Sequence, residues 1–273
     1  GVFRVVFTIY GKHFLTIMRQ VGDFSITPSV LLGVFIVVLA TLTVIIGVFM
    51  ALKSKDFKRM IGYVAVAEIG YMILAVGSAI STFQISEGGT SIIMSSYGRM
   101  ALTGGIFHMI NDALDVGLLF LVAGAIYYAT KDTSLNHLGG LSRKMKYTTV
   151  FFLIGLFAVS GLPPMNGFAS KLIIYQSIYQ VNPILTIIAI LCSIMLLAAF
   201  VKVFHSVFLG PELPSIKNVR EVPKSMLISM GILAFLIILF GLFPEYIINN
   251  IVEPAVNALS NPSGYISAII GGV

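Results

Sequence analysis

Three side chains that can carry protons, His108, Asp112 and Asp115, recur at one-turn spacing within a single apolar stretch. Positions i, i+4 and i+7 lie on one stripe of an α-helix, and Asn111 stands beside that stripe. Histidine titrates near neutral pH and burial favours the neutral form of a carboxylic acid, so these groups could pass a proton along the stripe. Buried ion pairs that only hold helices together are the alternative interpretation. Two acids one turn apart favour the relay, because like charges repel unless one of them holds a proton.

Two further charged residues, Glu68 and Lys171, also interrupt long apolar stretches. Glu68 follows the start of its stretch by about nine residues, which corresponds to roughly 14 Å along a helix. At that depth it is either a relay acid or a structural partner for a cation, and the sequence leaves both open. Lys171 could extend to the membrane surface, but its sequence neighbours offer nothing polar to help it. A lysine at such a depth is expensive, and we therefore expect Lys171 to be functional.

The stretch that holds Lys171 contains a helix break. Gly161, Pro163 and Pro164 interrupt the apolar run, and Gly167 follows shortly after. Proline removes a backbone donor and clashes with the preceding turn, whereas glycine lets the chain bend. Within a membrane the freed backbone groups must be satisfied by protein or water, and broken helices at depth mark ion and substrate sites. The pattern predicts two half-helices with unwound backbone between them, close to Lys171.

Composition indicates the class of protein to which these residues belong. The 273 residues are 58% hydrophobic and 10% charged, with a mean hydropathy of +1.00. Soluble globular domains carry about 25% charged residues, so this composition excludes them and indicates an integral membrane protein. A disulfide framework is excluded as well, because Cys192 is the one cysteine. The net charge of +6 does not imply nucleic acid, since in a membrane protein the location of the basic residues matters more than their number.

Spanning helices require about 20 apolar residues, and the sequence contains six such stretches. We therefore predict an all-α, polytopic transmembrane bundle of about six spanning helices with one broken helix. The segment after Pro244 has weak apolar character and is expected to lie on the surface or to be loosely ordered. The six stretches run over 25–52, 59–81, 100–129, 147–179 with the break inside it, 183–209 and 226–243.

The basic residues predict the orientation. Eleven of the 17 lysines and arginines fall in three connections, after the first, third and fifth stretches. The positive-inside rule places these connections in the cytoplasm. Lys58 stands in the first of them, and Lys202 and His205 stand near the end of the fifth stretch. All three are candidates for cytoplasmic proton access. The positive-inside rule already explains Lys58 and is the favoured explanation for it, whereas Lys202 and His205 could instead extend to the membrane surface.

Other kinds of site leave no pattern in this sequence. The histidines are scattered, no paired CxxC or HExxH is present, and the glycine-rich GGLS lacks the spacing of a phosphate-binding loop. Haem, flavin and iron–sulfur ligation patterns are also missing from it, so we expect no cofactor and no metal. The chain is not expected to be catalytic by itself, and the energy for ion movement would come from neighbouring subunits.

Five motifs resemble the antiporter-like proton-pumping membrane subunits shared by respiratory complex I, Mrp cation/proton antiporters and membrane-bound hydrogenase-type complexes. The resemblance covers nearly the whole chain and follows the order of motifs in the C-terminal half of those subunits. The motifs are DFKRMIGYVAVAEIGYM from Asp56, FHMINDALDVGLLFLVAG from Phe107, HLGGLSRKMKYT, GLPPMNGFASK and REVPKSMLISMGILA.

The resemblance implies roles for individual residues. Lys171 falls on the broken-helix lysine of that family and His108 on the first of two helix histidines, which together would form a hydrated proton path. Three positions depart from the pattern: Asp112 replaces the second histidine, Val116 replaces a frequent lysine, and Glu68 replaces a histidine or glutamine. A cationic path has become more acidic, which leaves both H⁺ and Na⁺ open as the transported ion.

The resemblance also implies an organisation and partners. Residues 1–24 would be the end of a preceding helix with an external loop, 25–209 a five-helix antiporter-like repeat, and 210–273 a last helix with a C-terminal tail. The family's N-terminal repeat would come from another membrane subunit. We therefore expect a multi-pass ion-translocating subunit of a respiratory redox or antiport complex, in a prokaryotic cell membrane. A structural subunit that no longer carries ions is the alternative, while an independent transporter or membrane enzyme should show a second repeat or a catalytic constellation.

Overall fold

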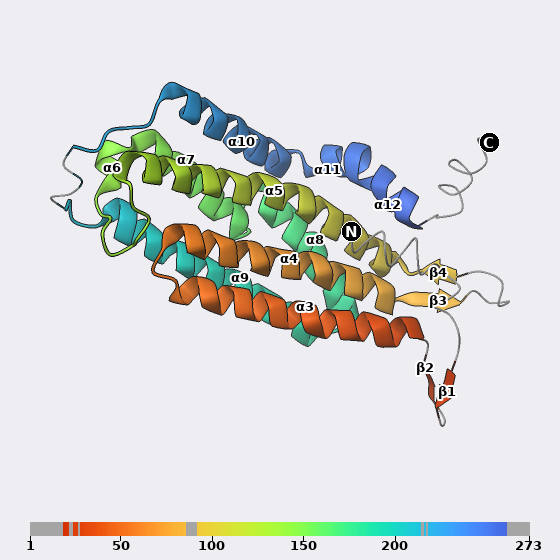
Figure 1. Cartoon of the computed structure of the whole chain (residues 1–273). Helices are drawn as coiled ribbons and strands as arrows, with labels where there is room; N and C mark the ends of the chain where they lie inside the picture. Colours follow the sequence, from red (N-terminus) through yellow and green to blue (C-terminus); the bar gives the residue numbers. More distant parts are fainter. Residues whose placement is uncertain are drawn as a thin grey trace, which may run out of the picture.

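Long helices lying side by side form the body of the protein (Figure 1). The computed structural model describes residues 19–21, 24–26, 28–85, 92–213, 216 and 218–260. The helices are α3 (Pro28–Lys53), α4 (Phe57–Ser81), α5 (Ser96–Thr130), α6 (Leu141–Lys144), α7 (Lys146–Val159), α8 (Asn166–Val181), α9 (Pro183–Val203), α10 (Lys224–Leu242), α11 (Pro244–Ile247) and α12 (Glu253–Ser260). Two π-helical segments, η2 (Phe204–Leu209) and η4 (Ile248–Val252), continue α9 and α11.

Five of the described helices are long and apolar enough to cross a membrane: α3, α4, α5, α9 together with η2, and α10. The remaining predicted stretch is divided into the shorter helices α7 and α8, with residues 160–165 between them. The prediction of an all-α membrane bundle with one broken helix is confirmed. Two short antiparallel hairpins, β1 (Arg19–Val21) with β2 (Phe24–Ile26) and β3 (Phe83–Ile85) with β4 (Ile92–Met94), lie at one end of the bundle (Figure 1).

Local sequence explains where the helices begin. The Asp56 carboxylate accepts a hydrogen bond from the Arg59 amide at 2.8 Å and caps α4. The Ser95 hydroxyl accepts one from the Gly98 amide at 3.1 Å and caps α5. Before α9, Asn182 caps the helix and Pro183 occupies its first turn, where no amide donor is needed. These caps satisfy amides that the first turn of a helix leaves without partners.

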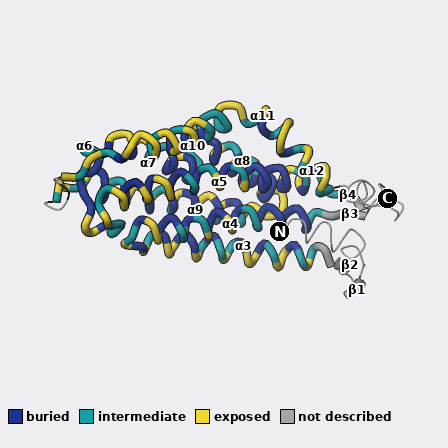
Figure 2. Tube along the Cα trace, turned by 45° about the horizontal axis from the view of Figure 1, so that its top comes forward, coloured by how far each residue is buried: buried dark blue, intermediate teal, exposed yellow. Residues whose placement is uncertain are grey.

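The inner faces of the helices are buried and the outward faces are exposed and apolar (Figure 2). On α3, for example, Leu31 and Phe35 are 67% and 60% exposed. Close packing of α3 on α4 depends on small residues, since a Cβ at Gly47 would lie 2.8 Å from the Ala67 amide nitrogen. Small residues at helix contacts and an apolar outer surface are both typical of membrane bundles.

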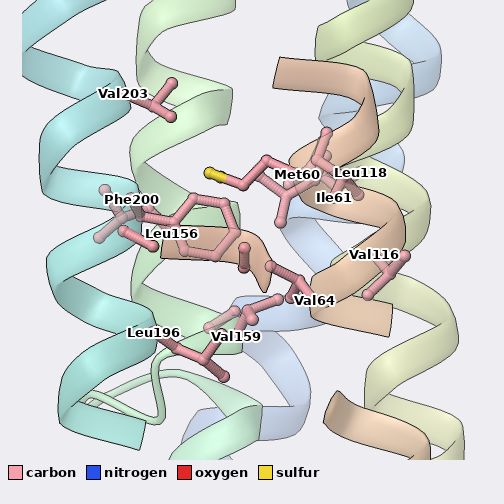
Figure 3. Packing of buried hydrophobic residues seen from close by; sticks show 14 of the residues in the cluster. Met60, Ile61, Val64, Val116, Leu118, Leu156, Val159, Leu196, Phe200 and Val203 are labelled. Carbon is pink, nitrogen blue, oxygen red and sulfur yellow. The ribbon is translucent and has the colours of Figure 1, made fainter. Parts of the chain in front are cut away.

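An apolar layer fills the bundle between its loop end, which holds α6, and the middle of α4. Figure 3 shows how its side chains pack. Side chains from four helices meet there, and all of them are less than one-tenth exposed. The layer includes Met60, Ile61 and Val64 of α4, Val116 and Leu118 of α5, Leu156 and Val159 of α7, and Leu196, Phe200 and Val203 of α9.

The two ends of the chain are only partly described. Residues 244–260 lie on the surface, as one of the two expected alternatives had it, and they are helical rather than loosely ordered, with Val252 and Val256 buried. Glu253 accepts a hydrogen bond from Thr103 at 3.1 Å and pairs with Arg99, which fixes α12 against α5. Residues 261–273 lie outside the described part of the chain. Of residues 1–24, only 19–21 and 24 are described, and they belong to the β1–β2 hairpin, so the helix end expected before them lies outside it too.

Candidate functional site

Three ionisable side chains from three helices meet in the interior of the bundle. The Lys171 ammonium on α8 donates a hydrogen bond to Glu68 Oε1 on α4 at 2.9 Å. The other oxygen, Glu68 Oε2, lies 3.0 Å from His108 Nε2 on α5. All three side chains are only 2% exposed. A single carboxylate therefore links a lysine and a histidine that are 63 positions apart in the sequence.

The helix break supplies the rest of the lysine's environment. Lys171 Nζ donates a second hydrogen bond, of 2.7 Å, to the carbonyl oxygen of Val159, the last residue of α7. Carbonyls at the end of a helix have no partner within that helix, so the break makes this acceptor available. The ammonium also lies 4.7 Å from the centre of the Tyr71 ring, within cation–π range. Gly161 adopts a φ of 71°, a conformation that favours glycine, as the chain turns out of α7.

His108 is held from both sides. Its Nδ1 lies 3.1 Å from the hydroxyl oxygen of Ser170, the residue before Lys171. If Nε2 carries the proton toward Glu68, then Nδ1 accepts from Ser170, and the opposite tautomer reverses both roles. The imidazole ring therefore has a polar oxygen within 3.1 Å of each of its nitrogens.

The start of α8 lies against the polar face of α5. Asn111 Nδ2 donates a 3.0 Å hydrogen bond to the Asn166 carbonyl, and Asn166 Oδ1 accepts from the Gly167 amide at 2.9 Å. A Cβ at Gly167 would lie 2.0 Å from the Ala158 carbonyl oxygen and 3.4 Å from Asp115 Oδ2. The Asp115 carboxylate thus stands next to the first turn of α8, where the helix dipole favours negative charge.

Several buried polar atoms in this region have no hydrogen-bond partner within the described part of the protein. They are His108 Nε2, Asn111 Oδ1, Asp112 Oδ1, Asp115 Oδ1, Ser160 Oγ and Asn166 Nδ2; of these, His108 Nε2 lies 3.0 Å from Glu68 Oε2 but is not aligned for a hydrogen bond. Most buried polar groups in proteins find partners in protein or ordered water. These atoms lie on α5 and around the break, so the polar region extends beyond the Glu68 carboxylate.

The predicted site residues divide into two groups. Glu68, His108 and Lys171 come together, Asp115 lies beside the break, and Asp112 is half-buried on the same helix. Among the described residues, the ion pair of Lys171 is with Glu68. The break residues Gly161, Pro163, Pro164 and Gly167 occupy the connection between α7 and α8 and the first turn of α8.

The three candidates for cytoplasmic access lie apart from this group, near the loop end of the bundle. Lys58 and His205 are exposed. Lys202 Nζ donates hydrogen bonds to the carbonyls of Leu52 at 2.7 Å and Ser54 at 2.8 Å, at the end of α3. Lys202 therefore caps a helix, a role in which cations are favoured.

Three contributors to the site are missed by sequence reasoning: the Tyr71 ring, the Ser170 hydroxyl and the Val159 carbonyl. Tyr71 stands three residues after Glu68, on the same helix face, which is a usable signal. Ser170 immediately precedes Lys171 but looks like an ordinary small residue. A backbone carbonyl leaves no trace in the sequence, except that a break must expose some of them.

The chain is similar in sequence or fold to several known proteins. It is 29% identical over 235 residues to hydrogenase-4 component B of Escherichia coli, covering 82% of this chain and 34% of that protein. It is 26% identical, over an alignment of 276 positions, to formate hydrogenlyase subunit 3 of the same organism, covering 91% of this chain and 44% of that protein. Among solved structures, the Mrp complex from Dietzia sp. gives a TM-score of 0.75 at 20% identity, with 87% of this chain and 49% of that chain covered.

The chain spans less than half of the length of the two curated relatives named here. Residues 13–197 match the family model described as NADH:quinone oxidoreductase/Mrp antiporter, TM. Because that match covers more than half of its length, the chain belongs to the NADH:quinone oxidoreductase/Mrp antiporter transmembrane family.

Proposed function

We propose that this membrane subunit moves ions, with the proton as the first candidate, through a relay formed by Glu68, Lys171, His108, Asp112 and Asp115. The observation that carries the proposal is the buried Glu68 carboxylate, which lies within 3.0 Å of both the Lys171 ammonium and the His108 imidazole. Ionisable groups buried in a membrane are expensive, so their presence together indicates a role in moving charge.

The geometry supports proton exchange within this group. A proton that moves from the Lys171 ammonium to Glu68 Oε1 converts an ion pair into two neutral groups, so no isolated charge is created in the interior. If the carboxyl group then rotates so that its protonated oxygen faces His108, Glu68 can release that proton to an unprotonated Nε2; in the opposite direction, the Glu68 carboxylate can accept a proton from Nε2 through Oε2, at 3.0 Å. Direct transfer requires donor and acceptor within hydrogen-bond distance, and both steps satisfy that requirement.

From His108 the path would continue along α5. The polar atoms of Asn111, Asp112 and Asp115 that find no partner among the described residues can be satisfied by ordered water, which also transfers protons. On the side of the loop end, the layer that contains Val64 and Phe200 separates the group from solvent in this conformation. Movement of ions past that layer needs a change in packing, which a charge change in a neighbouring subunit could drive.

The partners belong to the same proposal. Related proteins are components of multi-subunit membrane complexes, including hydrogenase and Mrp complexes. We propose that other membrane subunits of such a complex cover this chain. The parent complex would provide the driving reaction, and no resident cofactor is assigned to this chain.

A structural subunit is the second candidate, and a specific observation favours it. Lys171 is held by Glu68, by the Val159 carbonyl and by the Tyr71 ring, so its charge is well compensated as a fixed connection between α4, α7 and α8. A fixed pair would join helices without exchanging protons.

Replacement of Lys171 separates the two candidates. Lys171→Ala in the intact complex should abolish most proton uptake into proteoliposomes while the driving reaction continues. Recovery of the assembled complex by affinity purification serves as the control for folding. Normal proton uptake per turnover by an assembled Lys171→Ala complex would assign the residue to the scaffold and overturn the relay.

A further inference from the structure

A basic recess lies at the loop end of α3 and α4, away from the buried Glu68 group. It has a volume of about 420 Å³. Its lining includes Lys53 at the end of α3, Lys55 in the turn that follows, and Arg59 in the first turn of α4. Ligand sites in proteins usually begin at about 300 Å³, so the recess is large enough for a small polar group.

The positive charges of this recess are poorly compensated. Within the described chain, no ion pair involves Lys53, Lys55 or Arg59. The acid in the lining is Asp56, and its two oxygens accept hydrogen bonds from the Arg59 amide and the Thr133 hydroxyl. The recess therefore carries uncompensated positive charge, which would favour the binding of an anion.

The arrangement of polar and apolar residues in the lining indicates which class of anion would fit the recess. Met50 lies one turn before Lys53, and Tyr63 lies one turn after Arg59. Both positions are nearer to the middle of the membrane-spanning helices than the cations are. Thus a cationic rim stands above an apolar and aromatic wall, in the same order as the headgroup and the glycerol and acyl region of a phospholipid. Tyrosine is enriched at this depth, where its ring meets the membrane–water interface.

We propose that this recess binds the phosphate of an anionic phospholipid, with Lys53, Lys55 and Arg59 as ligands and Met50 and Tyr63 against the glycerol and upper acyl chain. Basic pockets at the cytoplasmic ends of membrane helices favour such lipids over zwitterionic ones. The bound lipid would join the end of α3 to the start of α4 and to the loop that contains Ser134, which also lines the recess. The proposal does not depend on whether the buried site conducts ions.

Lipid binding to the purified complex tests the proposal by native mass spectrometry. Phosphatidylglycerol should bind in preference to phosphatidylcholine, and the variant Lys53→Gln/Lys55→Gln/Arg59→Gln should lose affinity by about fivefold for each charge removed. Lys58→Gln is the matched control, because Lys58 is exposed in the same turn of α4 but does not line the recess. It should retain the affinity of the unmodified protein.

Three results would overturn the proposal. Equal binding of the two lipids would show that charge is not recognised. The single variant Lys55→Gln tests the site even if the triple variant fails to assemble. An equal loss of phosphatidylglycerol affinity in Lys55→Gln and in Lys58→Gln would indicate that diffuse surface charge binds the lipid. Displacement of phosphatidylglycerol by inorganic phosphate at equal concentration would assign the recess to a soluble anion.

Discussion

Glu68 and Lys171 are separated by 103 positions in the sequence, yet their charged groups lie 2.9 Å apart in the interior of the bundle. Each is placed by its own helix, Glu68 by α4 and Lys171 by α8 just beyond the break. The pair is nearly inaccessible to solvent, so each charge depends on the other for compensation. Changes to one member therefore have consequences for the other.

The first prediction concerns this dependence. Lys171→Ala leaves the Glu68 carboxylate without its ammonium partner, and removal of one member of a buried pair typically costs about 3–5 kcal/mol of stability. The double variant Lys171→Ala/Glu68→Gln removes both charges and should recover much of that loss. Thermal unfolding of the purified complexes should show a higher midpoint for the double variant than for Lys171→Ala. Both variants should fail to translocate protons, and a double variant that is less stable than Lys171→Ala would contradict the pairing.

The second prediction concerns the orientation of His108. Ser170→Ala removes the hydroxyl that lies 3.1 Å from His108 Nδ1 and should slow proton transfer, because the ring loses the contact that fixes its tautomer. Ser177→Ala is the matched control, since Ser177 is equally buried on α8 and bonds only to the Ile174 carbonyl among the described residues. Proton-uptake rates measured from pH 5 to 9 should change in shape for Ser170→Ala and not for Ser177→Ala. Identical profiles would remove Ser170 from the relay.

The fold could be predicted because each helix has a local signal in the sequence. Apolar runs of sufficient length predicted helices that agree with α3, α4, α5, α9 and α10 within a few residues. Pro163 and Pro164 predicted the gap between α7 and α8. The helical order of 244–260 was not predicted, since it depends on the contacts of Glu253 with Arg99 and Thr103, about 150 positions away.

The site was only partly predictable for the same reason. Buried charges can be recognised one at a time from their apolar surroundings, and Glu68, His108 and Lys171 were each identified in this way. Which charge compensates which depends on how the helices pack, and no spacing within one helix reveals that. Lys202 is a second example. The sequence made it a candidate for proton access, but its ammonium bonds to backbone carbonyls at the end of α3, and such contacts cannot be read from the sequence.

The third prediction concerns the two aspartates of α5. If Asp112 exchanges protons with the Glu68 group, Asp112→Asn should reduce transport more than Asp115→Asn, because the motif resemblance aligns Asp112 with the second helix histidine of the family. Proteoliposome assays of both variants, with and without Na⁺, provide the measurement. Small and equal effects would favour static buried charges. A Na⁺ dependence that disappears in Asp112→Asn would identify sodium as the transported ion.

The fourth prediction concerns orientation. The turn after α3, the connection from α5 to α7 and the connection from η2 to α10 lie at one end of the bundle (Figure 1). Single cysteines placed at Lys55, Asn136 and Arg220 should react alike with an impermeant thiol reagent, and from the cytoplasmic face. Cys192 is buried and should contribute little background. Reaction of the Asn136→Cys protein from the opposite face would contradict this arrangement.

The fifth prediction concerns the close approach that holds the break in place. A Cβ at Gly167 would lie 2.0 Å from the Ala158 carbonyl oxygen, a backbone atom that cannot move without shifting the end of α7. Gly167→Ala should therefore destabilise the protein by about 1–3 kcal/mol and also impair transport, because Val159, the acceptor for Lys171, directly follows Ala158.

Gly62→Ala is the matched control, since a Cβ there meets nothing within 4 Å and alanine favours a helix by roughly 0.5–1 kcal/mol over glycine. Thermal unfolding should show a lower midpoint for Gly167→Ala and an unchanged or higher one for Gly62→Ala. A Gly167→Ala protein with full stability and normal proton uptake would mean that the two half-helices can separate without disturbing the Lys171 contact.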